Sequence, residues 1–218
     1  MLPCASPGVR ALSPASALSL AGLSDGAIGN TGDPPQGSGA RAEAPIVNRR
    51  LVHPGRSISV YVEQAKLPNG RSVELDILRH PGAAAVVPFL SQTEVLLIRQ
   101  YRHAAGGTIL EVPAGKLDGE DPARCAAREL EEEAGQRAGR LEKLGAIWTT
   151  PGFTDERIHL FAAYDLKTVP QRLESDEVIE LVRLPLGRAL ELVWNGEIAD
   201  AKSALALLHA AHRHGMLG

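Results

Sequence analysis

Hydrophobic and polar residues alternate one by one in two stretches of the chain. The first stretch spans residues 58–62 and the second spans 73–77, and the triplet Pro68-Asn69-Gly70 lies between them. Alternation with period two is typical of strands that bury one face, and Asn-Gly favours a tight hairpin turn. The pattern therefore predicts a small antiparallel sheet, with strands over 49–53, 57–64 and 73–78.

The next apolar runs are continuous rather than alternating. Residues 83–89 and 94–99 are mostly apolar, which suits strands that are buried on both faces. Further strands are predicted over 109–112, 141–149, 158–164 and 178–184, and helices over 122–134, 185–194 and 201–212. These elements do not form a long parallel βαβ series, so their order favours a mixed sheet sandwiched between helices.

The helix predicted over 122–134 has clear start and stop signals. Asp121 has the side chain of an N-cap, and Pro122 stands at the first helical position. Gly135 is the residue type that most often ends a helix.

Acidic residues gather on one face of this helix. At ~100° per residue, Glu129, Glu132 and Glu133 fall within an arc of roughly 100°, whereas Glu131 points about 160° away from Glu129 and Glu133. Clustered carboxylates repel one another, and a hard cation with oxygen ligands, such as Mg²⁺, would offset that repulsion. The alternative is a solvated acidic surface, but the glycine-containing loop over 112–115 can add backbone carbonyls to a metal site.

Residues 1–45 differ in composition from the rest of the chain. They are rich in Ala, Ser, Gly and Pro and contain no aromatic residue. Such a segment buries too little apolar surface to offset its ordering entropy, so we expect a disordered extension. The run from Leu12 to Leu23 is a poor signal-peptide core because Pro14 and several Ser interrupt it. A targeting signal, a linker and a misassigned start stay open as interpretations.

Charge and cysteine content narrow the function classes. The formal net charge is −3, which gives no basic footprint for nucleic acid. Cys4 falls in the atypical extension and Cys125 in the predicted helix, so a structural disulfide is not expected and a reducing, cytoplasmic setting is the default. No apolar run reaches the ~18–20 residues of a membrane span.

The acidic helix and the loop before it resemble the Nudix box. That motif is Gly, five residues, Glu, seven residues, then Arg-Glu-apolar-any-Glu-Glu-any-Gly-apolar. The matching residues are Arg128, Glu129, Leu130, Glu132, Glu133 and Gly135, with Glu120 at its correct distance from Arg128. Two departures are visible: only four residues separate Gly115 from Glu120, and the last apolar position is Gln136.

Four other segments are similar to the ADP-ribose pyrophosphatase subfamily of Nudix proteins. Pro151 follows Gly135 by sixteen residues within PGFTDE, and the segments LIRQYR, ILEVPAGK and NGEIADAK also resemble that subfamily. The resemblance implies hydrolysis of ADP-ribose to AMP and ribose 5-phosphate. The alternatives are GDP-mannose or another nucleoside diphosphate sugar, a damaged nucleoside triphosphate, and a non-catalytic ligand-binding module.

The resemblance also implies an architecture and an assembly. It implies an α/β fold, the Nudix α/β/α sandwich on a mixed sheet, with a small N-terminal antiparallel sheet. The extension is assigned to residues 1–45, the N-terminal sheet to 46–80 and the catalytic domain to 81–218. Family members of this kind are domain-swapped homodimers, so we expect the segment 46–80 to mediate dimerisation.

The resemblance assigns the metal site to the helix and its preceding loop. The expected cofactor is Mg²⁺, with Mn²⁺ possible, in two or three ions. Their expected ligands are Glu129, Glu133 and Glu132, together with the main chain of Ala114. Arg128 is expected to support catalysis by pairing with a carboxylate.

The expected general base lies in a loop that follows the box. Glu177 is the first choice and Glu174 the second, while Glu132 is counted among the catalytic candidates as well as the ligands. The candidates for contact with the small-molecule nucleoside diphosphate sugar are Arg99, Arg102, Glu111, Lys116 and Phe153. For each of these the alternative is an ordinary surface or core role.

Overall fold

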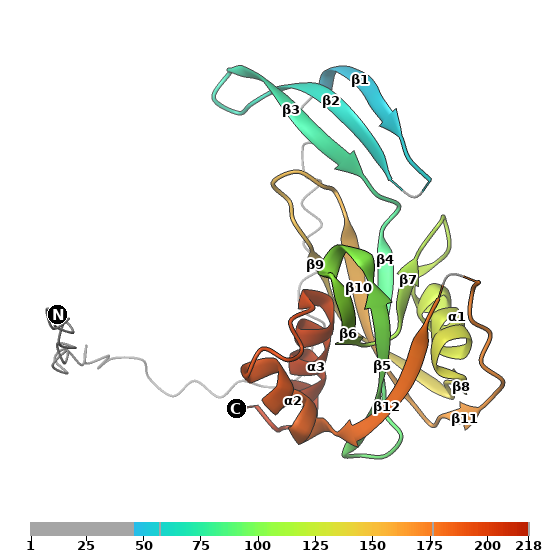
Figure 1. Cartoon of the computed structure of the whole chain (residues 1–218). Coiled ribbons are helices and arrows are strands. Elements are labelled where there is room, and N and C mark those ends of the chain that lie inside the picture. The colour runs from blue at the N-terminus through green and yellow to red at the C-terminus, as the bar shows by residue number, and fades with distance from the viewer. Residues whose placement is uncertain (1–45, 57, 176, 218) are drawn as a thin grey trace, which may run out of the picture. The chain divides into compact units, whose positions relative to one another are not determined.

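The structure, a computed structural model, describes residues 46–56, 58–175 and 177–217 (Figure 1). The extension predicted over residues 1–45 lies outside the described residues. The first described elements are β1 (Ile46–Pro54), β2 (Ser59–Lys66) and β3 (Ser72–Arg79), which form an antiparallel sheet in the order β1-β2-β3. The predicted small antiparallel sheet is therefore present, and Gly70 in its turn has a φ of 83°.

Two larger sheets and one short pair of strands form the rest of the strand framework. In the first, β4 (Ala83–Pro88) runs parallel to β10 (Arg157–Tyr164), and β7 (Ala114–Lys116) and β9 (Arg140–Trp148) flank them in antiparallel orientation. In the second, β5 (Glu94–Arg102) lies between β6 (Gly107–Glu111) and β12 (Ile179–Pro185) and is antiparallel to both. A short pair joins β8 (Gln136–Arg137) to β11 (Lys167–Thr168), and a 3-10 turn, η1 (His103–Ala105), follows β5.

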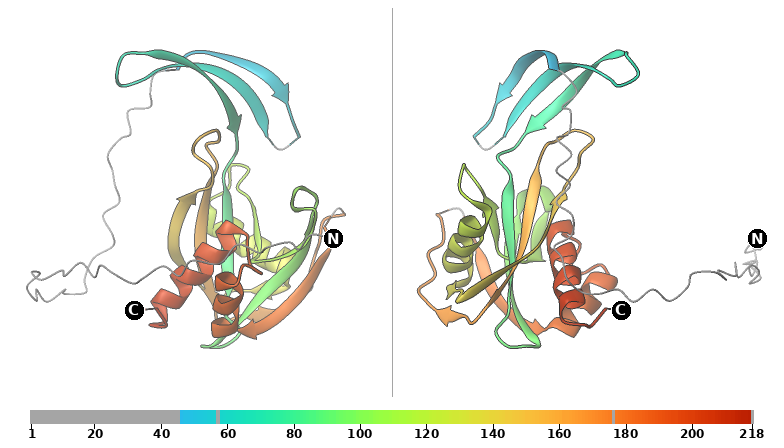
Figure 2. Two further views of the ribbon diagram at one scale, coloured as in Figure 1. Left: turned by 60° about the vertical axis from the view of Figure 1, so that its left-hand side comes forward. Right: turned by 180° about the vertical axis from the view of Figure 1, so that it is seen from behind.

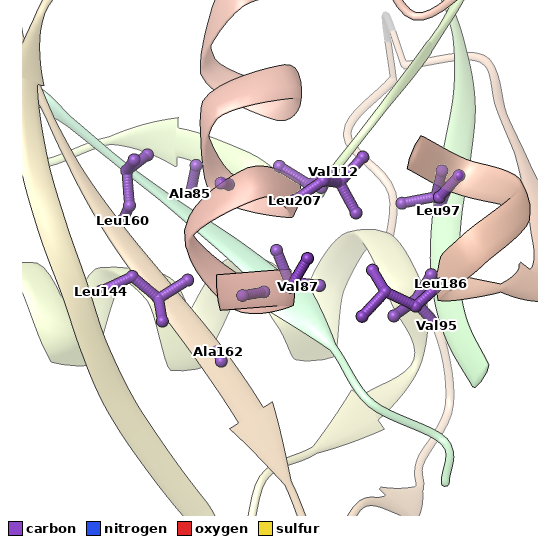
Figure 3. Close-up of a cluster of buried hydrophobic side chains, with 14 of the residues drawn as sticks. Ala85, Val87, Val95, Leu97, Val112, Leu144, Leu160, Ala162, Leu186 and Leu207 are labelled. Atoms are coloured by element: carbon purple, nitrogen blue, oxygen red, sulfur yellow. The ribbon is translucent and has the colours of Figure 1, made fainter. Parts of the chain in front are cut away.

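Helices cover both faces of this framework, so the mixed sandwich is confirmed. Helix α1 (Pro122–Ala134) lies on one side, and α2 (Leu186–Trp194) and α3 (Ala201–Arg213) lie on the other (Figure 2). Strand β4 contributes to both cores: Ala84 and Val86 belong to the cluster with Leu130 of α1. Their neighbours Ala85 and Val87 belong to the cluster with Leu207 of α3 (Figure 3). A strand covered on both faces needs apolar residues at every position, which explains its continuous apolar run.

One strand is longer than the apolar pattern predicts. The run ends at Arg99, but β5 continues through Gln100 and Tyr101 to Arg102, paired with β6 along that whole length. Its end is polar because it leaves the core and reaches the cavity described below, where Gln100 and Arg102 form part of the wall. Strands of two or three residues, such as β7 and β8, carry too little periodicity to be predicted.

The last strand of the N-terminal sheet is bonded to the loop that contains Pro151. The amide of Leu78 donates to the carbonyl of Phe153 at 2.8 Å. Arg79 pairs with Asp155 at 2.8 Å and with the buried Glu63 at 2.6 Å.

None of the described helices is long and apolar enough to cross a lipid bilayer.

Candidate active site

Helix α1 begins and ends where its sequence signals predict. The Oδ1 atom of Asp121 accepts hydrogen bonds from the amides of Ala123 (2.9 Å) and Arg124 (3.2 Å). Gly135 adopts a left-handed conformation with a φ of 59°, and its amide donates to the carbonyl of Glu131. These caps fix the two ends of the helix, and its rotation follows from the burial of Cys125, Ala126, Leu130 and Ala134 against the sheet.

Strand β7 packs against α1 closely enough to require a glycine. A Cβ atom added to Gly115 would lie only 1.7 Å from Oε1 of Glu129. The thiol of Cys125, one turn earlier in the helix, lies 3.3 Å from the carbonyl oxygen of Lys116 and 3.5 Å from that of Gly115. The missing side chain at Gly115 thus makes room for a carboxylate directly over the strand.

The loop that is one residue shorter than the Nudix pattern closes as a tight turn. Its central residues, Asp118 and Gly119, have φ values of 46° and 86°, and the amide of Glu120 donates to the carbonyl of Leu117 at 2.7 Å. Asp-Gly is a favoured pair for a turn with two positive φ angles. The turn still delivers Glu120 to Arg128, whose Nε atom lies 3.1 Å from Oε2 of Glu120.

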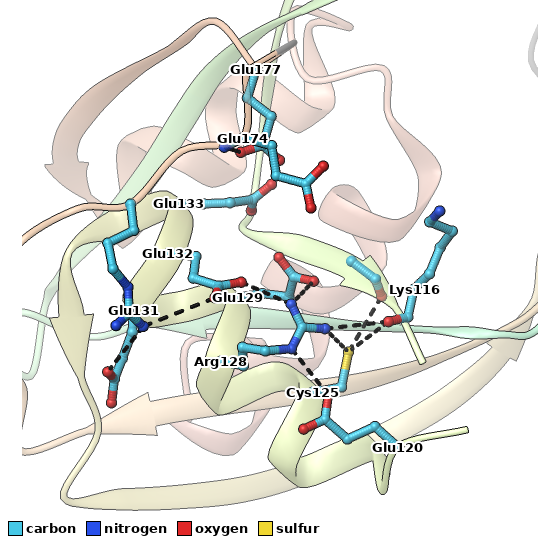
Figure 4. Close-up of polar contacts among 12 residues, drawn as sticks. Lys116, Glu120, Cys125, Arg128, Glu129, Glu131, Glu132, Glu133, Glu174 and Glu177 are labelled. Atoms are coloured by element: carbon cyan, nitrogen blue, oxygen red, sulfur yellow. Dashed lines mark hydrogen bonds and ion pairs between the residues drawn. The ribbon is translucent and has the colours of Figure 1, made fainter. Parts of the chain in front are cut away.

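Arg128 is the centre of a cluster of ion pairs on the inner side of α1 (Figure 4). Its Nη1 atom lies 2.7 Å from Oε1 of Glu129 and 2.9 Å from Oε2 of Glu132. Together with the contact to Glu120, the guanidinium therefore contacts three carboxylates. The predicted pairing of Arg128 with a carboxylate is therefore present, and its supporting role in catalysis stays a prediction.

Two of the box glutamates are buried without full compensation of their charge. Glu129 is 8% exposed and Glu133 is 2% exposed. Burial raises the pKa of Glu133 to about 8, and the nearby Glu129 and Glu177 add to this rise, although the amide of Ala114 donates to Oε2 of Glu133 at 2.8 Å. Burial also raises the pKa of Glu129, against the opposing effect of Arg128.

Glu131 lies on the other face of the helix, as predicted. Its carboxylate pairs with Arg137 at 2.7 Å and with Arg172 at 3.9 Å. The hydrogen bond from Arg137 lowers the pKa of Glu131. Figure 4 shows this side chain pointing away from Glu129 and Glu133.

A segment that follows β11 is attached to the C-terminal end of α1. The amide of Val169 donates to the carbonyl of Gly135, and the amide of Arg172 donates to the carbonyl of Glu132, both at 2.9 Å. The side chain of Gln171 donates to the carbonyl of Glu133. These bonds satisfy free carbonyls of the helix end and bring the residues that follow, Glu174 and Glu177, to the same space as Glu133 (Figure 4).

A cavity of about 860 Å³ collects most of the predicted site residues. Helix α1, strands β5, β6 and β7, the loop after β11 and the start of α3 all contribute to its wall. The predicted residues that line it are Arg102, Glu111, Ala114, Lys116, Arg128, Glu129, Glu133, Glu174 and Glu177.

Three predicted residues are not part of this wall. Glu132 pairs with Arg128 instead, and its side chain is 29% exposed. Arg99 lies 3.9 Å from Glu180 with a side chain that is 52% exposed, and Phe153, at 48% exposure, lies in the loop beside β3. Within this chain the structure does not bring these three to the cavity, and their roles stay predictions.

The cavity also contains residues that the motif did not single out. Asp200 and Lys202 reach it from the start of α3, and Gln100 reaches it from β5. Gln100 is 4% exposed, and its Oε1 atom has no hydrogen-bond partner among the described residues. The resemblance of NGEIADAK was the available signal for Lys202, but it gave no role to the lysine.

The donors beside α1 suit a hard divalent cation. In the part of the chain that the structure describes, Glu133 has no cationic side chain in ion-pair contact, and Glu129 shares Arg128 with two other carboxylates. The main chain of Ala114 lies in hydrogen-bonding contact with Glu133. Oxygen ligands of this kind are those that Mg²⁺ prefers. Among the described residues no group of three His, Cys, Asp or Glu side chains converges as a metal centre, so main-chain oxygen or water would complete the coordination.

Comparison with known proteins places this geometry in a family. The model of the NUDIX domain matches residues 78–205. The chain is 40% identical over 168 residues to the ADP-ribose pyrophosphatase of Bacillus subtilis (strain 168), covering 76% of this chain and 91% of that protein. It is 39% identical over 140 residues to the GDP-mannose pyrophosphatase of Cronobacter sakazakii, covering 60% and 73%.

A solved structure described as an ADP compounds hydrolase supports the same fold. It matches with a TM-score of 0.69 and 24% identity, covering 79% of this chain and 96% of that chain. The chain therefore belongs to the Nudix family. Within that family it is a hydrolase of the pyrophosphatase type.

Proposed function

We propose that this enzyme hydrolyses the pyrophosphate of ADP-ribose to AMP and ribose 5-phosphate. The observation that carries the proposal is that one cavity holds both kinds of charge. Its wall contains the buried carboxylates of Glu129 and Glu133 and the cationic side chains of Arg102 and Lys116. A divalent metal and cationic side chains both neutralise the charge of a diphosphate. The likeness to an ADP-ribose pyrophosphatase supports this choice of substrate.

The proposed cofactor is Mg²⁺ or Mn²⁺, in two or three ions. Glu129, Glu133 and the main-chain carbonyl of Ala114 are the proposed ligands, with Glu132 as a further candidate. When bound, a divalent ion neutralises phosphate charge and lowers the pKa of a coordinated water. Arg128 holds the carboxylate of Glu129, since its Nη1 atom lies 2.7 Å away.

Glu177 is the proposed general base, with Glu174 as the second candidate. Glu177 is half-buried in the cavity wall and lies close enough to Glu133 to raise the pKa of that residue. Its Oε2 atom accepts a hydrogen bond from the amide of Glu174 at 2.8 Å, which restrains the side chain. In the proposed step Glu177 accepts a proton from water as the water oxygen bonds to phosphorus and the bridging P–O bond breaks.

The proposed substrate contacts are two cationic side chains that line the cavity. Arg102 and Lys116 are the proposed phosphate contacts, because a planar guanidinium and an ammonium group both bind phosphate oxygens. Glu111 is proposed to hold Arg102, with which it shares bonds of 2.8 and 2.9 Å. Arg99 and Phe153 stay candidates only for a site that includes a second subunit.

A homodimer that uses the N-terminal sheet is part of the proposal. Every residue of β1 is exposed, including Val47 at 66%, Leu51 at 47% and Val52 at 50%. Exposed large apolar side chains that gather on one strand are typical of an interaction surface. Light scattering at micromolar concentration should give twice the mass of the 23.1 kDa chain, and a monomeric mass would contradict the proposed homodimer.

A cytoplasmic location stays a prediction.

A substrate panel tests the function directly. With Mg²⁺ present, ADP-ribose should have a higher kcat/KM than GDP-mannose, ADP-glucose and 8-oxo-dGTP, with AMP as a product. A higher value for GDP-mannose would favour that alternative, for which the relative at 39% identity is the supporting observation. Binding without turnover on any of the four would favour a non-catalytic module.

A further inference from the structure

One buried carboxylate connects the C-terminal helix to the cavity wall. The side chain of Glu111 is only 3% exposed. Its Oε1 atom accepts a hydrogen bond from Nζ of Lys202 at 2.9 Å, across 91 residues of sequence. Its Oε2 atom accepts from Nε of Arg102 at 2.9 Å and lies 2.8 Å from Nη2 of the same residue. A buried carboxylate depends on such partners to remain charged.

The lysine determines how the carboxylate can hold the arginine. An arginine that pairs with a free carboxylate often places two N–H groups on two separate oxygens. Because Lys202 occupies Oε1, both Arg102 donors converge on Oε2. A guanidinium has five N–H donors, so this side-on arrangement leaves those of Nη1 unused by Glu111, on a side chain that is 38% exposed in the cavity wall.

Lys202 is itself held in place by the start of α3. Its Nζ atom lies 2.8 Å from Oδ2 of Asp200, the N-cap residue of that helix. The same Oδ2 atom accepts hydrogen bonds from the amide and the hydroxyl of Ser203. The hydroxyl oxygen of Ser203 in turn accepts from the amide of Val112 at 2.9 Å, next to Glu111. The ammonium group is therefore fixed from two sides, with a side chain only 12% exposed.

We propose that Lys202 is a positioning residue, which acts through Glu111 to orient the guanidinium of Arg102 toward the substrate's diphosphate. Without the ammonium group, the carboxylate is free to offer both oxygens to Arg102 and to draw its Nη groups away from the cavity. The proposal rests on the proposed function, since it assigns Arg102 to a phosphate. It gives the NGEIADAK segment a role in substrate binding rather than only in packing.

The test compares Lys202→Met with Lys202→Arg in the full-length enzyme. Lys202→Met should raise the KM for ADP-ribose about tenfold and change kcat less than threefold, because the lost interaction serves binding. Lys202→Arg keeps the charge and should restore most of the KM. In spectra of ¹⁵N-labelled enzyme, the Nε–H signal of Arg102, assigned with Arg102→Lys, should shift in Lys202→Met and return in Lys202→Arg.

Two controls separate positioning from folding and from direct contact. Lys167→Met, in exposed β11, removes the same charge away from the cavity and should leave KM unchanged. If Lys202→Met lowers the melting temperature, Lys202→Gln takes its place, because it removes the charge while its amide NH₂ group still provides N–H donors for the buried carboxylate. In the Arg102→Lys background, Lys202→Met should add nothing, since both changes act through one guanidinium.

Several results would overturn the proposal. A multiplied loss in the double variant would mean that Lys202 touches the substrate itself. An unchanged KM together with an unchanged Arg102 signal in Lys202→Met would mean that the ion pair is only structural. The spectroscopic result does not depend on turnover, so a wild-type enzyme that fails to hydrolyse ADP-ribose would reject the proposed function while the positioning of Arg102 is still measured.

Discussion

The two faces of helix α1 carry the same residue type in opposite states. Glu133 is 2% exposed, and burial raises its pKa to about 8. Glu131, two residues earlier, pairs with the exposed Arg137, and that hydrogen bond lowers its pKa. Helix propensity and residue chemistry are identical for the two glutamates, so the difference comes entirely from what lies against each face.

The inner face meets a strand, and the outer face meets solvent and arginines. Strand β7 passes so close that only glycine fits at Gly115, and the same strand supplies the amide that contacts Glu133. A carboxylate in this position loses water without gaining a full counter-charge, which leaves it ready for a cation. Charge alone therefore does not distinguish the two faces; the neighbouring backbone does.

The largest expected effect separates the two faces by activity. Glu133→Gln keeps the size of the side chain but removes a charge from the proposed metal site, so kcat/KM for ADP-ribose should fall by roughly 10²–10³-fold. Glu131→Gln makes the same chemical change on the outer face and should stay within a few-fold of wild type. Steady-state kinetics with Mg²⁺ measure both, and equal losses in the two variants would contradict the contrast between the faces.

The next effect tests the close approach of β7. Gly115→Ala places a Cβ where Oε1 of Glu129 lies, so the carboxylate must move, and kcat/KM should fall about 100-fold. Gly107→Ala, in β6, is the matched control because an added Cβ there meets nothing within 4 Å. A fully active Gly115→Ala enzyme would show that the position of Glu129 is not critical.

A third effect appears as stability of the metal-free protein. The folded state holds the proton of Glu133 up to a pKa of about 8, whereas the ordinary glutamate value is 4.5, so the folded state binds more protons between these pH values. Stability should therefore fall as pH rises through that window. In EDTA at pH 8, Glu133→Gln should melt higher than wild type, and the difference should be much smaller near pH 5.

Mg²⁺ should reverse that order by stabilising the charged carboxylate in the wild-type protein. Calorimetric or fluorescence melts at the two pH values provide the measurement. A Glu133→Gln variant that melts lower than wild type at pH 8 in EDTA would show that the buried charge is already compensated.

The smallest expected effect lies on the outer face. Arg137→Met removes the partner of Glu131, but Arg137 is exposed and an exposed ion pair contributes little to stability. The urea midpoint should stay within the scatter of repeat measurements, and the kinetics with ADP-ribose should not change. A clear loss of activity would mean that the outer face also orders the loop with Glu174 and Glu177.

Local patterns were sufficient to predict most of the fold. The caps of α1, the hairpin at Asn69-Gly70 and the apolar run of β4 depend on residues near one another in sequence, and each was found where predicted. The end of β5 was not predicted because Gln100 and Arg102 are polar and break the apolar run; both line the cavity. Gln136, which breaks the apolar pattern of the box, is 5% exposed and bonds to Thr168 across the short β8–β11 pair.

In the candidate site too, features that depend on neighbouring residues were predicted, and features that depend on contacts between distant residues were not. The inner and outer positions of Glu133 and Glu131 follow from helical spacing alone. The ion pair of Glu111 with Lys202 joins residues 91 positions apart and leaves no local pattern. Arg99 and Arg102 are three residues apart in β5 and therefore lie on opposite faces of the strand, and the sequence alone does not say which of these faces reaches the cavity.

The thiol of Cys125 lies between β7 and α1, so its reactivity reports on the separation of these two elements. The side chain is fully buried, and burial raises its pKa to about 11, so it resists alkylation while the junction is closed. In a Cys4→Ser background, the rate of labelling by a small iodoacetamide reagent would measure how often β7 separates from α1 by local opening. The contact between β7 and α1 that holds Glu129 in place thus has an opening equilibrium that labelling can measure. A ligand that binds to both elements should shift this equilibrium toward the closed state.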